Sequence, residues 1–206
     1  AENDADGDGL CCSDNIESEN ELYFDGDSDY VNCGNEVFNY INNNFTYEFY
    51  VKPDKQIDIP AVVHSAPYNY SGGNQNYIVF PEYINNGTGV SIGTNGLHVF
   101  EHGPGYLYPV LTYEFDNLLD EYIYVTIRYV NGTPELFING EFILSGENNG
   151  VAASPSPNLG GYVTLLYDWT FYKGYFHSYA VWDTSINEGQ INMDNFLNLS
   201  GSESNL

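Results

Sequence analysis

The segment Tyr122–Phe142, YIYVTIRYVNGTPELFINGEF, constrains the fold more than any other part of the chain. In its first third, apolar and polar side chains alternate with the period of two that is typical of a half-buried strand. Two Asn-Gly pairs, Asn131-Gly132 and Asn139-Gly140, supply the positive φ angles that tight hairpin turns need. The segment therefore predicts three antiparallel strands joined by two tight turns.

Further strand-like segments on both sides of this meander predict an all-β protein. The clearest is Phe45–Val51, in which apolar and polar side chains again alternate. Ser185 followed by Glu188 forms a capping box, which predicts one short helix over Ile186–Ile191. Shorter strands are expected near Ala61–His64, Tyr77–Phe80, Gly89–Ile92, Leu97–Phe100, Leu107–Tyr113, Tyr162–Tyr167 and Tyr175–Trp182. The segments His64–Asn76 and Ser145–Gly161 are expected to be long loops.

Four segments in this order resemble the sequence pattern of laminin-G-like, concanavalin A-like jelly-roll domains. They are FDGDSDYV (24–31), FTYEFYVKP (45–53), the meander itself and GYFHSYAVWDTSINEGQI (174–191). The resemblance implies a two-sheet antiparallel jelly-roll sandwich with one short carboxyl-terminal helix. We assign this domain to residues 21–206 and treat residues 1–20 as an amino-terminal extension. Because one fold hosts many activities, function has to be argued from the site.

The charge balance is one-sided, with 29 acidic and 4 basic residues and a net charge of −25. So few basic residues cannot hold a phosphate backbone, which excludes nucleic acid as a partner. Anionic membrane surfaces are disfavoured for the same reason, and no apolar run is long enough to insert into a membrane. Multivalent cations remain suitable partners.

The amino-terminal extension contains a candidate calcium loop. Asp4, Asp6 and Asp8 followed by Gly9 match D-x-D-x-D-G, in which side-chain oxygens converge on one ion and glycine permits the sharp turn. The acid that an EF-hand needs at its twelfth position is replaced by Asn15, and the loop instead resembles a thrombospondin type 3 loop. Asp14 lies nearby as a further ligand. Calcium is therefore one interpretation, and a solvated acidic tail is the other.

The cysteines and the glycosylation sequons both suggest a secreted protein. One of the adjacent Cys11 and Cys12 is expected to bond Cys33, because neighbouring cysteines rarely pair with each other. The remaining thiol would be buried or would bridge to another molecule. The chain begins at Ala1, as a processed mature protein would. Asn-x-Ser/Thr sequons occur at Asn44, Asn69, Asn86, Asn131 and Asn198.

No catalytic motif is complete. A glycosidase of the ExDxxE type would need a third acid after Glu114 and Asp116, and none stands at its place. His98 and Glu101 are close enough in sequence to share a metal, but strand followed by turn is the simpler interpretation. We therefore expect a protein that is not an enzyme.

Tyrosine-rich loops suggest sugar binding, because an exposed ring can cover the apolar face of a pyranose. Core packing is the alternative for each of these rings. We expect an extracellular adhesion or glycan-binding domain that meets glycans or other extracellular proteins. A subunit of a self-assembling filament is the competing hypothesis. The candidate ligand-binding residues are Tyr68, Tyr70, Tyr106, Tyr108, Trp169 and Tyr172.

Overall fold

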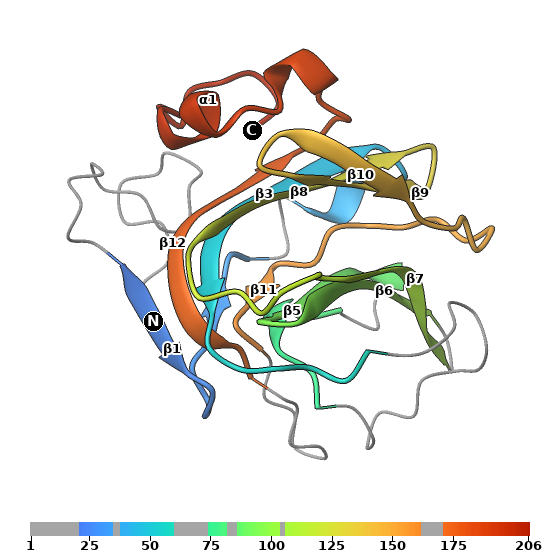
Figure 1. The fold of residues 1–206 in the computed structure, drawn as a ribbon. Coiled ribbons are helices and arrows are strands. Elements are labelled where there is room, and N and C mark those ends of the chain that lie inside the picture. Colours follow the sequence, from blue (N-terminus) through green and yellow to red (C-terminus); the bar gives the residue numbers. More distant parts are fainter. Residues whose placement is uncertain (1–20, 35–37, 60–73, 82–85, 104–105, 162–170) are drawn as a thin grey trace.

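The computed structural model describes residues 21–34, 38–59, 74–81, 86–103, 106–161 and 171–206. Within these residues the chain forms two six-stranded sheets whose ladders are antiparallel (Figure 1). Sheet A has the strand order β1-β12-β3-β8-β9-β10, and sheet B has the order β2-β11-β4-β5-β6-β7. The predicted two-sheet jelly-roll sandwich is therefore confirmed.

The elements have the following bounds. Sheet A contains β1 (Leu22–Asp25), β12 (Lys173–Trp182), β3 (Phe45–Pro53), β8 (Ile123–Val130), β9 (Thr133–Ile138) and β10 (Glu141–Ser145). Sheet B contains β2 (Val31–Asn32), β11 (Asn158–Leu159), β4 (Tyr77–Val79), β5 (Thr88–Gly93), β6 (Gly96–Gly103) and β7 (Tyr106–Glu114). The short helices are η1 (Phe38–Tyr40), η3 (Glu188–Gln190) and α1 (Met193–Leu197).

The predicted meander forms β8, β9 and β10. Asn131 and Gly132 have φ angles of 50° and 79°, and Asn139 and Gly140 have φ angles of 51° and 84°. Two successive residues with positive φ make the turn whose twist matches that of the flanking strands. The two Asn-Gly pairs therefore fix the register of three neighbouring strands.

The core lies between the two sheets and is rich in aromatic side chains. On the inner face of β3, Phe45, Tyr47 and Phe49 are fully buried and belong to the same cluster as Val90 and Leu97 of sheet B. The Phe45 ring stacks on that of Tyr129 with centroids 4.5 Å apart. Since the inner face takes every second residue of each strand, the residues between them point away from the core.

Two elements differ from their predictions. The capping box of Ser185 and Glu188 does not form, because the Ser185 hydroxyl donates to the carbonyl of Tyr129. The predicted span contains only the three-residue 3-10 helix η3, and the α-helix begins at Met193, where the Asn192 side chain accepts hydrogen bonds from the next turn. The segment Ser145–Gly161 is also more than a loop, since its β11 joins β2 to β4.

No helix in the described ranges is long and apolar enough to cross a membrane.

Candidate functional site on the outer face of sheet A

The outer face of sheet A, which points away from sheet B, has one part covered by the chain itself. The carboxyl-terminal segment runs from Ile186 to Leu206, and Figure 1 shows its helix α1 lying on this side of the sheet. Its apolar side chains pack with those of the sheet beneath, and the Phe196 ring stacks on Tyr124 at 5.4 Å. The covered cluster contains Tyr124, Phe137, Ala180, Trp182, Ile186, Ile191 and Phe196.

A buried carboxylate sits beneath this cover. Glu48 accepts hydrogen bonds from the Tyr124 hydroxyl and from the indole nitrogen of Trp182, the latter at 2.6 Å. Burial raises the pKa of Glu48, and the two hydrogen bonds oppose that rise. Both carboxylate oxygens are satisfied inside the protein, so this group has a structural role.

Arg128 fixes the start of the cover to the sheet. Its guanidinium contacts Glu135 at 2.6 Å and Glu188 at 3.2 Å, and it donates to the carbonyl of Ile186. The same group lies 4.9 Å from the centre of the Phe137 ring. This half-buried arginine bonds both to the sheet, through Glu135, and to the carboxyl-terminal segment, through Glu188 and Ile186. It therefore holds the segment in one position. This part of the outer face is therefore closed.

The other part of the outer face carries an aromatic cluster that we call the tyrosine face. It consists of Tyr23, Tyr50, Tyr122, Tyr175 and His177. Tyr23 and Tyr175 are paired with ring centroids 4.8 Å apart. Tyr50 lies 5.0 Å from Tyr122 and 5.3 Å from His177. Three separate strands and the residue before a fourth contribute these rings to one face of sheet A.

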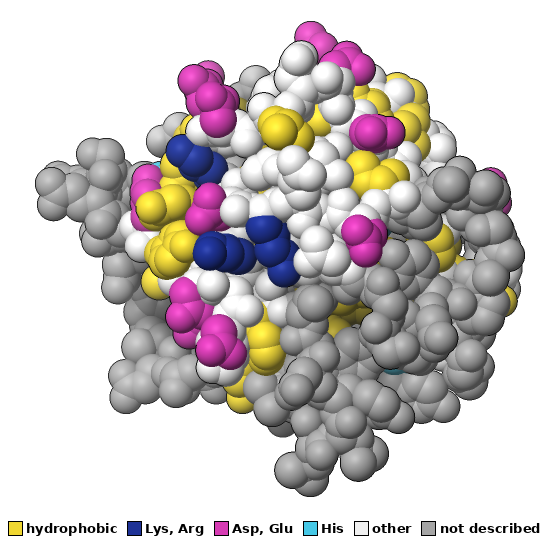
Figure 2. Space-filling model, turned by 60° about the horizontal axis from the view of Figure 1, so that its bottom comes forward, with side chains coloured by type: hydrophobic (Ala, Val, Ile, Leu, Met, Phe, Trp, Pro, Cys, Tyr) yellow, Lys and Arg dark blue, Asp and Glu magenta, His cyan; other side chains and the backbone are white. Residues whose placement is uncertain are grey.

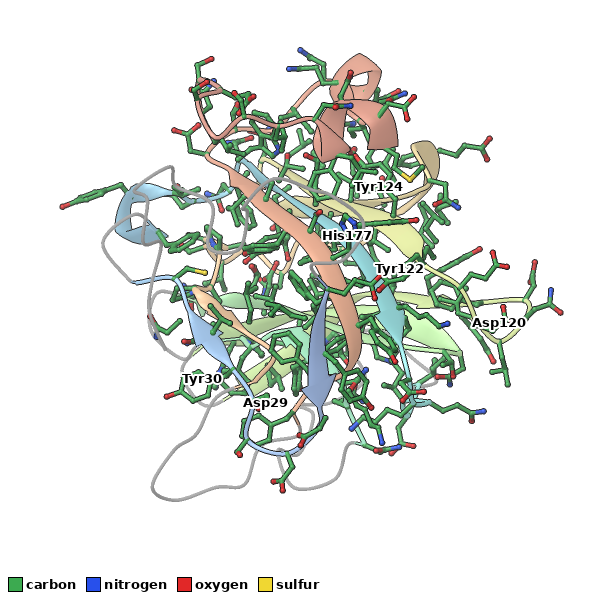
Figure 3. All side chains as sticks on the ribbon, turned by 90° about the vertical axis from the view of Figure 1, so that its left-hand side faces the viewer. Asp29, Tyr30, Asp120, Tyr122, Tyr124 and His177 are labelled. Carbon is green, nitrogen blue, oxygen red and sulfur yellow. The ribbon has the colours of Figure 1, made fainter. Side chains whose placement is uncertain are left out.

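These rings are open to solvent where they are paired. Tyr23 is 46% exposed and Tyr175 is 38% exposed, although rings of this size usually lie largely inside a protein. Figure 3 shows Tyr122, His177 and Tyr124 in a row across the sheet, with Tyr124 nearest to α1. The tyrosine face therefore begins where the carboxyl-terminal cover ends.

A β-bulge brings His177 onto the tyrosine face. The register of β12 against β3 shifts between Phe176 and Ser178, so that His177 is the extra residue. A bulge of this kind changes the direction of a side chain and is common beside binding sites. It also returns Tyr179 to the core, where its ring stacks on Phe49 at 5.4 Å.

Two hydroxyl groups of the tyrosine face lie beside carboxylates. The Tyr23 hydroxyl donates to Asp54 at 3.3 Å. The Tyr122 hydroxyl is shielded from solvent and lies beside the carboxylate of Glu21. Burial raises the pKa of Tyr122, and the carboxylate of Glu21 raises it further.

The predicted ligand-binding residues do not come together at this face. Tyr172 is fully buried against Phe24 with ring centroids 5.8 Å apart, so the prediction of an exposed ring is wrong there. Tyr108 is half-buried and packs on the main core. Tyr106 opens β7 in sheet B. The remaining candidates, Tyr68, Tyr70 and Trp169, lie outside the described residues.

The other predicted sites have mixed outcomes. His98 and Glu101 point to opposite faces of sheet B, because His98 contacts Thr112 and Asp58 whereas Glu101 reaches Tyr129 in the core. They therefore cannot share a metal. Within the described residues no group of three His, Cys, Asp or Glu side chains is arranged to hold a metal ion.

The amino-terminal predictions stay predictions. Cys33 is disulfide-bonded, while Cys11 and Cys12 lie outside the described residues. The calcium ligands Asp4, Asp6, Asp8 and Asp14 also lie there.

Four of the five sequons fall in the described part of the chain. Asn44, Asn131 and Asn198 are exposed and Asn86 is half-buried, whereas Asn69 is outside the described residues. Their occupancy stays a prediction.

The comparison with family models places the chain among known folds. Residues 25–192 match the family Laminin_G_3, described as the concanavalin A-like lectin/glucanases superfamily. No curated protein matches the sequence.

Solved structures share the fold at low sequence identity. A heptameric SAP-like pentraxin from Limulus polyphemus has a TM-score of 0.57 and 12% identity, over 89% of this chain and 84% of that one. The binding domain of botulinum neurotoxin DC in complex with SialylT has a TM-score of 0.55 and 15% identity, over 85% of this chain and 41% of that one. A structure of botulinum neurotoxin type C, whose cell entry depends on interaction with two ganglioside molecules, has a TM-score of 0.50 and 16% identity. The match covers 87% of this chain and 43% of that one. The chain thus spans less than half of each neurotoxin chain.

Proposed function

The chain belongs to the concanavalin A-like lectin/glucanases superfamily, and from this premise we propose that it is a non-catalytic glycan-binding domain whose ligand lies on the tyrosine face. The observation that carries the proposal is the exposed pair Tyr23 and Tyr175, adjoining Tyr50 and Tyr122 on one sheet. An exposed cluster of large rings marks an interaction surface. The apolar faces of pyranose rings can stack on such a surface while tyrosine hydroxyls bond sugar hydroxyls.

The division of the outer face supports this choice of surface. The chain covers Tyr124 and Trp182 with its own carboxyl-terminal segment, whereas Tyr23 and Tyr175 stay exposed. Similar folds support the same choice, since the solved neighbours include a neurotoxin binding domain in complex with SialylT and a neurotoxin whose cell entry depends on two ganglioside molecules.

The positions of the two acids that were candidates for glycoside hydrolysis agree with a non-catalytic role. Glu114 ends β7 and Asp116 lies beyond the strand, and both are exposed at the end of sheet B. A retaining glycosidase would instead hold its two carboxylates about 5–5.5 Å apart across one substrate site.

We place the domain outside the cell as an adhesion or glycan-contact module, on the support of its sequons and its cysteines. Calcium binding by the amino-terminal extension is part of the same proposal.

The proposal is tested by binding of glycan-array ligands to the full chain and its variants. We expect Tyr175→Ala and Tyr23→Ala each to weaken binding of an array-positive glycan roughly tenfold, about 1.4 kcal/mol, because a stacking ring is lost. Isothermal titration calorimetry gives the affinities.

A third tyrosine provides the matched control for these variants. Tyr40 is 88% exposed on η1 and belongs to neither sheet, so Tyr40→Ala should leave the affinity unchanged. Equal losses for all three variants, or no glycan bound by the native chain, would refute the proposal.

Self-assembly is the competing function, and a concentration-dependent polymer in analytical ultracentrifugation without any glycan binding would favour it.

A further inference from the structure

The positions of the basic residues indicate which kind of glycan the tyrosine face binds, an inference that rests on the proposed function. The chain has only four basic residues. Arg128 binds the carboxyl-terminal segment, as described above. The other three, Lys52, Lys55 and Lys173, lie together at the edge of the tyrosine face.

The strand register places two of these lysines beside the exposed rings. Lys52 is directly opposite Tyr175 in the ladder between β3 and β12. Lys173 stands two residues before Tyr175 and so shares its face of the sheet. Each ammonium group is thus carried on the same outer surface as the Tyr23 and Tyr175 pair.

Lys55 joins this group from the segment that follows β3. It is half-buried, and its pKa is lowered by burial and by the nearby positive charge of Lys173. Figure 2 shows basic side chains close together on one face of the molecule, among hydrophobic and acidic side chains. We call Lys52, Lys55 and Lys173 the lysine group.

Ion pairing with the described residues does not explain why these lysines are together. The ion pairs recorded among the described residues all belong to Arg128. Among the nearby acids, Asp25 accepts the amide of Asp27 and Asp54 accepts the Tyr23 hydroxyl, and neither forms an ion pair with a lysine. Asp25 even faces Lys173 across the ladder without forming an ion pair.

Fold stability does not explain the lysine group either. Like charges raise the energy of the folded state when they are brought together. The chain has 29 acidic residues with which three isolated lysines could pair. Three cations that lie together beside exposed rings, without an ion pair to any described residue, are suited to an anion that arrives from outside.

We propose that the ligand of the tyrosine face is an acidic glycan, whose carboxylate or sulfate groups contact the lysine group while its sugar rings stack on Tyr23 and Tyr175. Elsewhere a chain of net charge −25 repels such a ligand, so binding is confined to this place. The lysines act as point charges on flexible stems, which suits anionic groups in varied positions along a glycan.

Matched pairs of probes test the charge requirement on the full-length chain. 3′-Sialyllactose is compared with its methyl ester, and trigalacturonate with its methyl ester, so that only the carboxylate differs. A chondroitin sulfate tetrasaccharide and its unsulfated form test sulfate separately. We expect the acidic member of at least one pair to bind at least tenfold more tightly.

Variants assign the preference to the lysine group. Each single Lys→Gln change should weaken binding of the acidic probe about two- to fivefold, as for an exposed ion pair. The triple variant K52Q/K55Q/K173Q should abolish the preference, and K52R/K55R/K173R should retain it because the charges remain. Lys52→Gln alone, on a half-exposed strand position, keeps the test valid should the triple variant fail to fold.

The outcomes separate this inference from the function on which it rests. Equal binding of the neutral and acidic members overturns the inference and leaves glycan binding intact. A preference that survives in K52Q/K55Q/K173Q also overturns it. Binding of neither member of any pair removes the proposed function together with the inference.

Discussion

Replacing Glu101 by glutamine should make the protein more stable at alkaline pH, and the gain should grow as the pH rises. Glu101 is 1% exposed and points into the core, where Oε1 accepts the Tyr129 hydroxyl at 3.2 Å. Its other oxygen, Oε2, has no hydrogen-bond partner among the described residues. Burial raises the pKa of Glu101 from 4.5 to about 8, and the Tyr129 hydrogen bond only partly opposes this.

The direction of this pH dependence follows from the pKa values of Glu101 in the unfolded and the folded chain. Between pH 4.5 and about 8 the unfolded chain has lost a proton that the folded chain retains. Stability therefore falls as the pH rises through this range and is level above it. At one pKa unit per 1.36 kcal/mol, Glu101→Gln should gain about 2 kcal/mol over the native chain between pH 6.5 and pH 8.5. Urea unfolding at a series of pH values measures this difference.

Measurements above pH 6.5 avoid the pH range in which a second buried group, His98, changes the stability. Burial lowers the pKa of His98 to about 4, so its own contribution changes below pH 6.5 and with the opposite sign. Glu114→Gln is the matched control, because Glu114 is exposed at the end of β7. Profiles for the native chain and Glu101→Gln that stay parallel from pH 6.5 to 8.5 would contradict the account of this buried acid.

Shortening Phe196 to alanine should destabilise the protein by about 3 kcal/mol. Phe196 is the buried residue of α1, 4% exposed, and its ring stacks on Tyr124. Its loss removes the contact that holds the carboxyl-terminal segment over Glu48 and Trp182. Denaturant unfolding, followed by fluorescence from the tryptophans, measures the change.

The same helix supplies the control for this prediction. Met193 is 37% exposed at the start of α1, so Met193→Ala should lower stability by no more than about 0.5 kcal/mol. If the two variants were equally stable, the segment would not be part of the packed fold. The outer face would then have no closed part to set against the open tyrosine face.

The fold was largely predictable because its signals are local. Alternation in Phe45–Val51 and the two Asn-Gly turns depend only on neighbouring residues, and the structure has them as predicted. The strand β11 was missed because two residues carry no periodicity. It is held by contacts from far along the chain, such as the hydrogen bond between the side chains of Asn32 and Asn158.

The site was harder to predict because its residues come from strands distant in sequence. Tyr50 and Tyr175 could be recognised as strand residues, but only the order of sheet A brings Tyr23 beside Tyr175. The bulge at His177 reverses the alternation of β12 and has no sequence signal. Tyr172 does lie just before β12, as expected of a residue in or beside a loop, but its side chain is buried in the core. Sequence chemistry alone therefore suggested the type of site but placed it on other tyrosines.

The central claim is that glycans bind on the tyrosine face, and chemical-shift mapping of the isotope-labelled chain with an array-positive glycan tests it most directly. The account predicts that the largest backbone shifts fall on Tyr23, Tyr50, Lys52 and Tyr175, with little change in the carboxyl-terminal segment. Shifts that instead concentrate on sheet B, for example along β6 and β7, would contradict it.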